Sequence, residues 1–174
     1  MSAPFSIRLL RPDDLADYKA LRDTMLAAHP SAFTSDATEG RLRTPESYRS
    51  RLGLERADGG QFTLGARDDA GLLLGAIGCE RDARFKVRHI GHLVGMMVRE
   101  HAQGRGIGRA LLAECIAQAR RAEGLEMLTL TVTAGNRPAI ALYEGFGFVR
   151  YGSLARAIRV DGQYHAKDQM VLAL

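Results

Sequence analysis

The sequence predicts an α/β (α+β) fold, in which helices flank a mixed, largely antiparallel central sheet. Strand-like segments and amphipathic helical segments follow one another along the chain, which is typical of mixed sheets. A short turn separates two successive strand segments and favours antiparallel pairing, whereas a long helical segment lies between 89–98 and 127–134 and favours a parallel pair. A chain of 174 residues is expected to form a single domain, 1–174.

The first part of the chain is expected to supply one strand and two helices. Asp13 or Asp14 can cap the first helix, and Pro30 stops it. Thr44 and Pro45 suit the N-cap and the first turn of the second helix. The expected elements are a strand within 5–14 that ends at Pro12, a helix to about His29, a loop at 30–44 and a helix at 44–57.

The remainder is expected to contain most of the sheet. The segment 89–98 is apolar on both faces, which indicates a central buried strand. Turn residues at 68–71 and at Asp161-Gly162 each separate two strand segments, and Gly124 is expected to close the long helix. The expected elements are strands at 61–67, 71–82 and 89–98, a helix at 107–123, a strand at 127–134, a helix at 136–146, and strands at 148–160 and 164–173.

Composition excludes several classes of protein. The net charge is +4 and the pI is near 9.4, but the arginines are scattered, so nucleic-acid binding is not expected. No apolar run is long enough to span a membrane, and the N-terminus shows no secretion signal. Cys79 and Cys115 stand alone, which predicts neither a disulfide framework nor a metal site and suits the cytoplasm.

A glycine-rich loop between a buried strand and a helix is the clearest candidate for phosphate binding. Converging backbone N–H groups, the helix dipole and glycines that permit positive φ together favour an anion. The Walker pattern and the GxGxxG dinucleotide pattern both fail here. Arg105 and Arg109 could add charge-assisted contacts, although a turn that merely starts a helix would also explain the glycines. The loop comprises Gln103, Gly104, Arg105, Gly106, Ile107 and Gly108.

Two motifs resemble those of the GNAT superfamily of N-acetyltransferases. The pattern Gln-x-x-Gly-x-Gly, after a strand that ends at Val98, is similar to the family's motif A. The segment Asn136–Phe148, with Asn, Ala, Leu-Tyr and Gly-Phe at the family's spacings, is similar to its motif B. The order of the expected elements agrees with a GNAT-like acyl-CoA acyltransferase fold.

The resemblance implies that acetyl-CoA is the co-substrate. It implies that the amides of 103–108 hold the coenzyme A pyrophosphate, and that Met96, Met97 and Val98 pair with the pantetheine arm like an added strand. Gly95 fits the β-bulge that the family has in this strand. Asn136 would contact the cofactor, although capping of its own helix would equally explain this residue.

The resemblance also suggests catalytic groups. Tyr143 matches the family's general acid toward the coenzyme A sulfur, and a buried structural tyrosine is the alternative. Many relatives carry a glutamate six residues before the valine that ends this strand; His92 stands there and would accept the amine proton directly or through water. A histidine bonded within the core is the alternative, and Glu80 and Asp82 could bind a cationic substrate instead.

The predicted function is therefore direct transfer of an acetyl group from acetyl-CoA to a primary amine of a small molecule or peptide. The alternative is a non-catalytic acyl-CoA-binding sensor or scaffold. The acceptor is expected between 29–34 and 157–167, whose mixed polarity does not specify it. The resemblance also allows a homodimer through the C-terminal strands.

Overall fold

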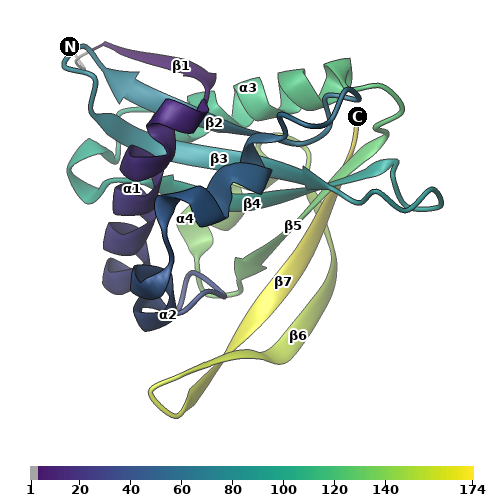
Figure 1. Cartoon of the computed structure of the whole chain (residues 1–174). Coiled ribbons are helices and arrows are strands. Elements are labelled where there is room, and N and C mark those ends of the chain that lie inside the picture. The colour runs from purple at the N-terminus through teal and green to yellow at the C-terminus, as the bar shows by residue number, and fades with distance from the viewer. Residues whose placement is uncertain (1–3) are drawn as a thin grey trace.

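The computed structural model describes residues 4–174, and these contain one seven-stranded sheet in the order β1-β2-β3-β4-β5-β7-β6 (Figure 1). Residues 1–3, at the start of the N-terminal segment in which no secretion signal is expected, lie outside the described part. The strands are β1 Phe5–Leu9, β2 Phe62–Asp68, β3 Leu73–Arg81, β4 Ile90–Val98, β5 Met127–Thr133, β6 Val149–Val160 and β7 Gln163–Ala173. The α-helices are α1 Leu15–Ala28, α2 Ala37–Leu42, α3 Ile107–Arg121 and α4 Arg137–Glu144. No helix within 4–174 is long and apolar enough to cross a membrane.

The pairing of the strands confirms the predicted mixed sheet. Every neighbouring pair is antiparallel except β4 and β5, which run parallel on either side of the helical crossover α3. The long β6–β7 hairpin turns at Asp161-Gly162, as the sequence predicts. In Figure 1, β2, β3 and β4 run across the molecule, whereas β5, β7 and β6 run down toward the tip of this hairpin.

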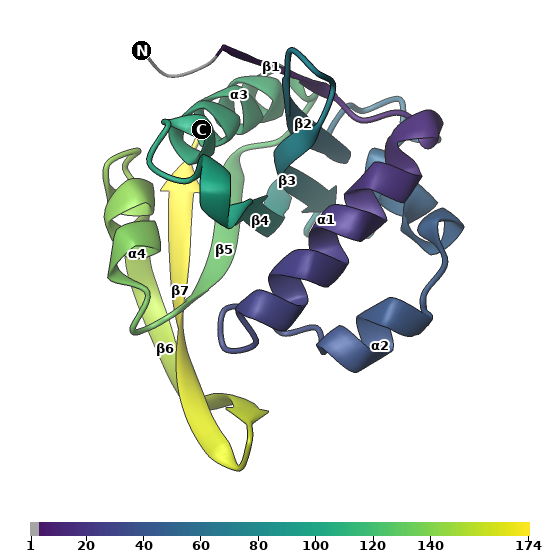
Figure 2. The ribbon, with the colours of Figure 1, turned by 90° about the vertical axis from the view of Figure 1, so that its left-hand side faces the viewer.

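Helices cover both faces of the sheet, as Figure 2 shows: α1 and α2 lie on one side, and α3 and α4 on the other. The larger core lies under α3, whose five predicted inner residues are all buried. The smaller core lies under α1 and includes the rings of Tyr18 and Tyr48, which meet edge to face. The inner residues of α3 are Leu111, Leu112, Cys115, Ile116 and Ala119.

Two predictions for the segment after α1 were wrong. The expected loop at 30–44 contains the short helix α2, because the Asp36 carboxylate accepts hydrogen bonds from the amides of Thr38 and Glu39. The expected helix at 44–57 is a 3₁₀ helix, Pro45–Leu52, that ends at the left-handed Gly53. The Thr44 side chain makes no capping hydrogen bond, although Pro45 does stand in the first turn.

Two boundaries and one helix cap also differ from the prediction. The first strand stops at Leu9, because a 3₁₀ turn, Pro12–Asp14, takes up the rest of the expected segment. Asp14 occupies the N-cap position of α1, but its carboxylate accepts a hydrogen bond from the Arg11 amide instead of capping the helix. The helix α3 ends at Arg121, two residues before the predicted end at 123, because Ala122 is already extended.

The Asp14 carboxylate joins the start of α1 to the edge of the sheet. Its oxygens accept hydrogen bonds from both terminal nitrogens of Arg8 in β1 at 2.7 and 2.8 Å, and from Arg67 in β2 at 2.6 Å. The Asp14 side chain is only 8% exposed. Without this carboxylate, Arg8 would lose its ion pair, and the largely buried Arg67 would keep only its second partner, Asp17. Breaking a largely buried charge network in this way is costly.

We expect Asp14→Asn to lower the free energy of unfolding by about 2–4 kcal/mol at neutral pH. Hydrogen bonds from Arg8, aided by Arg11 and Arg67, hold the pKa of Asp14 well below its usual range. This stabilisation is present above the carboxyl group's unfolded pKa and is lost as pH falls through the depressed folded pKa. Urea unfolding at pH 7 and pH 3 should therefore show a smaller difference between variant and wild type at pH 3. The exposed neighbour provides the control: Asp13→Asn should change little at either pH, and an equal loss in both variants would contradict this role.

Candidate functional site

The centre of the sheet opens where β4 leaves β5. Strand β4 pairs with β3 from Gly91 to Val98, but with β5 only from Ile90 to His92. Beyond that point the backbone of β4 has no strand beside it on the β5 side. Since main-chain N–H and C=O groups bind an extended ligand as a further strand would, this open edge is suited to a chain that carries amide groups.

A β-bulge at Gly95 lies at the start of this open edge. Gly78 of β3 pairs with Val94 and Ala76 pairs with Met97, so that two residues of β4 stand opposite one residue of β3. Gly95 has a φ of 60°, in the left-handed region that other residues rarely adopt. The bulge implied by the resemblance is therefore confirmed, and bulges of this kind bend the strand that contains them.

The open edge leads directly into the glycine loop. A 3₁₀ turn, Glu100–Ala102, follows β4, and Gly104 and Gly106 have φ values of 75° and 79° before α3 begins at Ile107. A Cβ atom on either glycine would meet no other atom within 4 Å. No side chain caps α3 at Gly106, so its first amides are left for another acceptor at the positive end of a 15-residue helix, as in an anion site.

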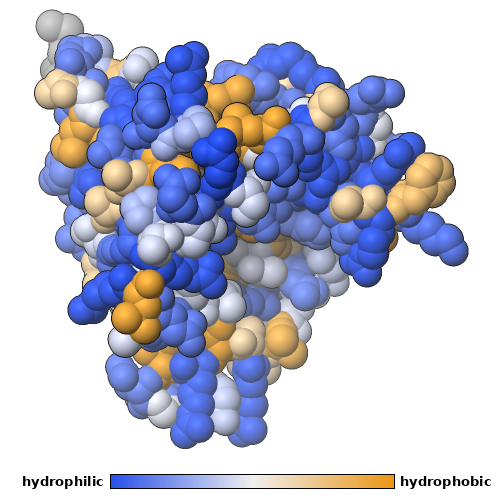
Figure 3. All heavy atoms as spheres, viewed as in Figure 1, coloured by the Kyte–Doolittle hydropathy of each residue, from blue (hydrophilic) through white to orange (hydrophobic). Residues whose placement is uncertain are grey.

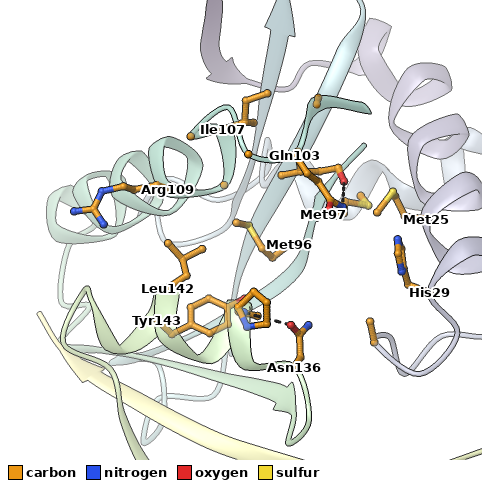
Figure 4. Close-up of a pocket in the computed structure, with 18 of the residues that line it drawn as sticks. Met25, His29, Met96, Met97, Gln103, Ile107, Arg109, Asn136, Leu142 and Tyr143 are labelled. Carbon is orange, nitrogen blue, oxygen red and sulfur yellow. Dashed lines mark hydrogen bonds between the residues drawn. The ribbon is translucent and has the colours of Figure 1, made fainter. Parts of the chain in front are cut away.

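A cavity of about 520 Å³ lies between this loop, α4 and the end of α1. Figure 4 shows side chains around it from these three elements: Gln103 from the loop, Tyr143 from α4, and His29 directly after α1. The Gln103 side chain donates a hydrogen bond to the Val98 carbonyl at 3.3 Å, which ties the loop to the end of β4. The volume lies within the range of sites for small molecules.

Most of the residues predicted for the site line this cavity. The predicted residues that do so are Met96, Met97, Val98, Gln103, Gly104, Gly106, Ile107, Gly108, Arg109, Asn136 and Tyr143. Arg105 and His92 are not among its lining residues. The guanidinium of Arg109 lies 5.1 Å from the centre of the Phe146 ring and, in Figure 4, points away from the cavity. The helix start is thus the main electrostatic feature of this wall.

Helix α4 presents two of the predicted residues to the cavity. The Asn136 side chain caps the helix by accepting a hydrogen bond from the Ala139 amide at 3.3 Å, and it also lines the cavity. Tyr143 is buried and packs edge to face on Phe148, with ring centres 5.8 Å apart. Burial raises the pKa of Tyr143 to about 12. This phenol therefore keeps its proton at neutral pH and can donate a hydrogen bond into the cavity.

The predicted base lies away from the cavity. His92 is exposed on β4, between Glu80 of β3 and Thr129 of β5, and its Nδ1 lies 2.6 Å from the Thr129 hydroxyl. The two carboxylates considered as sites for a cation are both engaged by arginines. Glu80 lies 3.6 Å from Arg51, and Asp82 forms a short ion pair with Arg84.

Several residues of the cavity wall were not predicted from the sequence. Met25 comes from the last turn of α1, and its apolar position predicted only a core residue. Ala102, Pro138, Ala139 and Leu142 also line the cavity, and only their places in or beside the two motifs pointed to them.

The segment 29–34 was predicted to lie beside the acceptor. Three of its residues, His29, Ala32 and Phe33, line this cavity.

Comparison with known proteins gives consistent results. Residues 21–148 match the family model described as "Acetyltransferase (GNAT) family". The mycothiol acetyltransferase of Salinispora arenicola is 34% identical over 131 residues, which are 75% of this chain and 42% of that protein. The chain thus spans less than half the length of this relative. The N-alpha-acetyltransferase RimI of Mycobacterium tuberculosis is 39% identical over 104 residues, 57% of this chain and 59% of that protein.

A solved structure is similar over nearly the whole chain. The acetyltransferase of the GNAT family from Streptococcus pneumoniae superposes with a TM-score of 0.87 at 30% identity. The match covers 98% of this chain and 100% of that one. The mixed sheet with its flanking helices is therefore a fold that is already known.

Proposed function

The chain belongs to the GNAT family of acetyltransferases, and from that premise we propose that it transfers an acetyl group from acetyl-CoA to a primary amine. The observation that carries the proposal is the continuous run from the open edge of β4 through the glycine loop to the start of α3. This run offers backbone groups to an amide-bearing arm and amides to a pyrophosphate, in the order in which they occur in coenzyme A.

The residues present fit acetyl-CoA. The edge at Met96–Val98 would bind the amides of the pantetheine arm, and the amides of 103–108 would hold the pyrophosphate. Asn136 caps α4 and lies on the wall of the same cavity, so it can serve both its helix and the arm. When bound, acetyl-CoA supplies a thioester whose carbonyl carbon is open to attack by an amine.

The protein's own groups would then guide the transfer. The amine nitrogen forms a bond to the acyl carbon, the carbon–sulfur bond breaks, and the electron pair leaves on the sulfur. A backbone N–H near Val98 is the proposed donor to the thioester carbonyl. Tyr143 faces the same cavity, and since its pKa is about 12, well above the thiol value of about 8.5, it stabilises the departing thiolate by donating a hydrogen bond. In our proposal the amine proton passes through water to His92.

Release of coenzyme A thiol with a panel of amines, with mass measurement of the products, tests the reaction. We expect thiol release that depends on both acetyl-CoA and amine, whereas binding without turnover would favour a non-catalytic acyl-CoA-binding sensor.

Gly106→Ala should weaken coenzyme A binding about tenfold or more, because its Cβ would project beside the bound phosphates.

Gly71→Ala is the matched control for the loop. Gly71 has a φ of 83°, its Cβ would also meet nothing within 4 Å, and it lies in the β2–β3 turn outside the cavity. Both variants should lose similar stability, but only Gly106→Ala should lose affinity in calorimetric titration. Equal affinity in the two variants would remove the loop from the coenzyme site.

Tyr143→Phe should lower kcat by about 10²-fold and leave coenzyme A affinity nearly unchanged, since the ring and its packing on Phe148 remain. Burial keeps Tyr143 protonated to about pH 12, so its ionisation should not lower the rate of the wild type between neutral pH and about pH 11. Steady-state kinetics across pH would measure the kcat of the variant and the pH dependence of the wild type. Tyr151→Phe, on the exposed face of β6, is the control and should change neither kcat nor coenzyme A affinity. An unchanged kcat in Tyr143→Phe would remove this residue from the mechanism.

His92→Asn should lower kcat by about tenfold or more and leave coenzyme A affinity nearly unchanged, because asparagine cannot accept the amine proton. His29 lines the cavity directly, with its Nε2 3.3 Å from Glu100, so His29→Asn is the informative comparison. The kcat of each variant with saturating amine decides the assignment. A kcat that falls in His29→Asn but not in His92→Asn would transfer the role to His29.

A further inference from the structure

A second cavity of about 230 Å³ adjoins the first at the bulge of β4. The two cavities share Ala32 and Phe33 of the connection after α1. The second extends from there along Leu93–Gly95 of β4 toward Thr131 of β5. Figure 3 shows that this face of the molecule is hollowed above the β6–β7 hairpin. An acceptor in this second cavity would lie immediately beside the end of the donor cavity.

The charged groups of the second cavity are all basic, and we call it the basic pocket. Arg22 from α1, Arg51 from the 3₁₀ helix and Lys167 from β7 line it, and no acidic residue does. Arg22 is 4% exposed and Lys167 is 6% exposed. Buried charges of one sign are costly unless an opposite charge compensates them.

The contacts of these side chains leave their charge largely uncompensated. Arg22 donates one hydrogen bond, to the Ser35 hydroxyl at 3.3 Å, and its buried Nε has no partner. Lys167 donates to the Ala32 carbonyl at 2.9 Å, and burial lowers its pKa. Neither forms an ion pair with a residue in the described range 4–174.

The positive charge of Arg51 is only partly compensated. Its nearest carboxylate, Glu80, lies 3.6 Å away and is 41% exposed to solvent. Its Nη1 donates to the Tyr18 hydroxyl at 3.2 Å. The guanidinium groups of Arg22 and Arg51 lie 5.3 and 5.6 Å from the centre of the Tyr48 ring, which attracts cations but carries no net charge. Among the described residues, one exposed carboxylate therefore pairs with one of the three cations.

The guanidinium groups converge on the bulge itself. A Cβ atom built on Gly95 would lie 3.3 Å from Nη1 of Arg22 and 3.6 Å from Nη1 of Arg51. Gly95 directly precedes Met96, where the wall of the donor cavity begins. A group bound by these two nitrogens therefore lies next to the expected place of the thioester, within the span of a small molecule.

We propose that the basic pocket binds an oxyanion, a carboxylate or a phosphate, that belongs to the acceptor, so that the acceptor is a small anionic amine. This inference rests on the proposed acetyl transfer and adds the chemical class of its acceptor. Arginine forks and a buried ammonium suit such oxyanions. Arg51 engages Glu80 and Arg84 engages Asp82, so neither carboxylate is left to bind a cation. The three cations of the basic pocket would also repel a polyamine.

Pairs of amines that share the same amino group, of which one member carries an oxyanion, test the inference. Amino acids would be compared with their carboxamides, and O-phosphoethanolamine with ethanolamine, with spermidine as the cationic member. We expect kcat/KM to be about tenfold or more higher for the anionic member of one pair, and that pair identifies which oxyanion is used. Equal or higher values for the neutral members or for spermidine would overturn the proposal.

Variants connect this preference to the pocket. Arg22→Met and Lys167→Met should each reduce the ratio between the anionic and neutral members by about tenfold or more, with the KM for acetyl-CoA nearly unchanged. Lys167→Met decides the question if Arg22→Met does not fold. Arg81→Met is the matched control, since that buried arginine is 2% exposed and pairs with Asp58 outside both cavities. A ratio that changes equally in Arg81→Met would overturn the proposal.

Direct binding separates failure of this inference from failure of the proposed function. Inorganic phosphate and acetate would be titrated calorimetrically into the wild type and Lys167→Met, each with coenzyme A present. Oxyanion binding that the variant loses, without transfer to any amine, would refute the acetyl transfer and keep the oxyanion site. Transfer to neutral and anionic amines alike, with no oxyanion bound, would refute the site and keep the transfer.

Discussion

The glycine bulge in β4 is the constraint on which the rest of the site depends. A strand paired along both edges has no main-chain groups left for a ligand. In this sheet, Gly95 and Met96 stand opposite a single residue of β3, and β4 beyond His92 is paired on one side only. Because the unpaired stretch leads into the glycine loop, one continuous segment offers backbone groups from the bulge to the start of α3.

The two sides of the site use different chemistry. The donor side consists largely of main-chain groups and the end of a helix, and its arginine, Arg109, lies over Phe146. The acceptor side that we propose consists of charged side chains, Arg22, Arg51 and Lys167, from three separate elements. Backbone contacts depend on the fold and tolerate side-chain changes, whereas charged side chains can be exchanged without altering the sheet. A family of proteins can therefore keep one donor and vary its acceptor.

The accuracy of the sequence-based prediction follows the length and periodicity of each element. The long helix α3 and the buried strands were predicted to within a few residues, because their apolar patterns are regular. The helix α2 was missed because it has six residues, too few for a pattern, and depends on its Asp36 cap and on Gly40, which packs closely on Leu26. The 3₁₀ form of Pro45–Leu52 was likewise not visible in its composition.

The sequence by itself determined the donor side of this protein. Its determinants, the bulge glycine, the loop glycines and the Asn136–Tyr143 helix, act within short segments whose spacing can be read directly from the chain. Only the tertiary structure revealed the proposed acceptor side. Arg22, Arg51 and Lys167 are far apart in the sequence and look like ordinary surface cations until α1, the 3₁₀ helix and β7 bring them together around Gly95. These charges are costly without an anion because they are buried, and burial depends on packing and not on spacing along the chain.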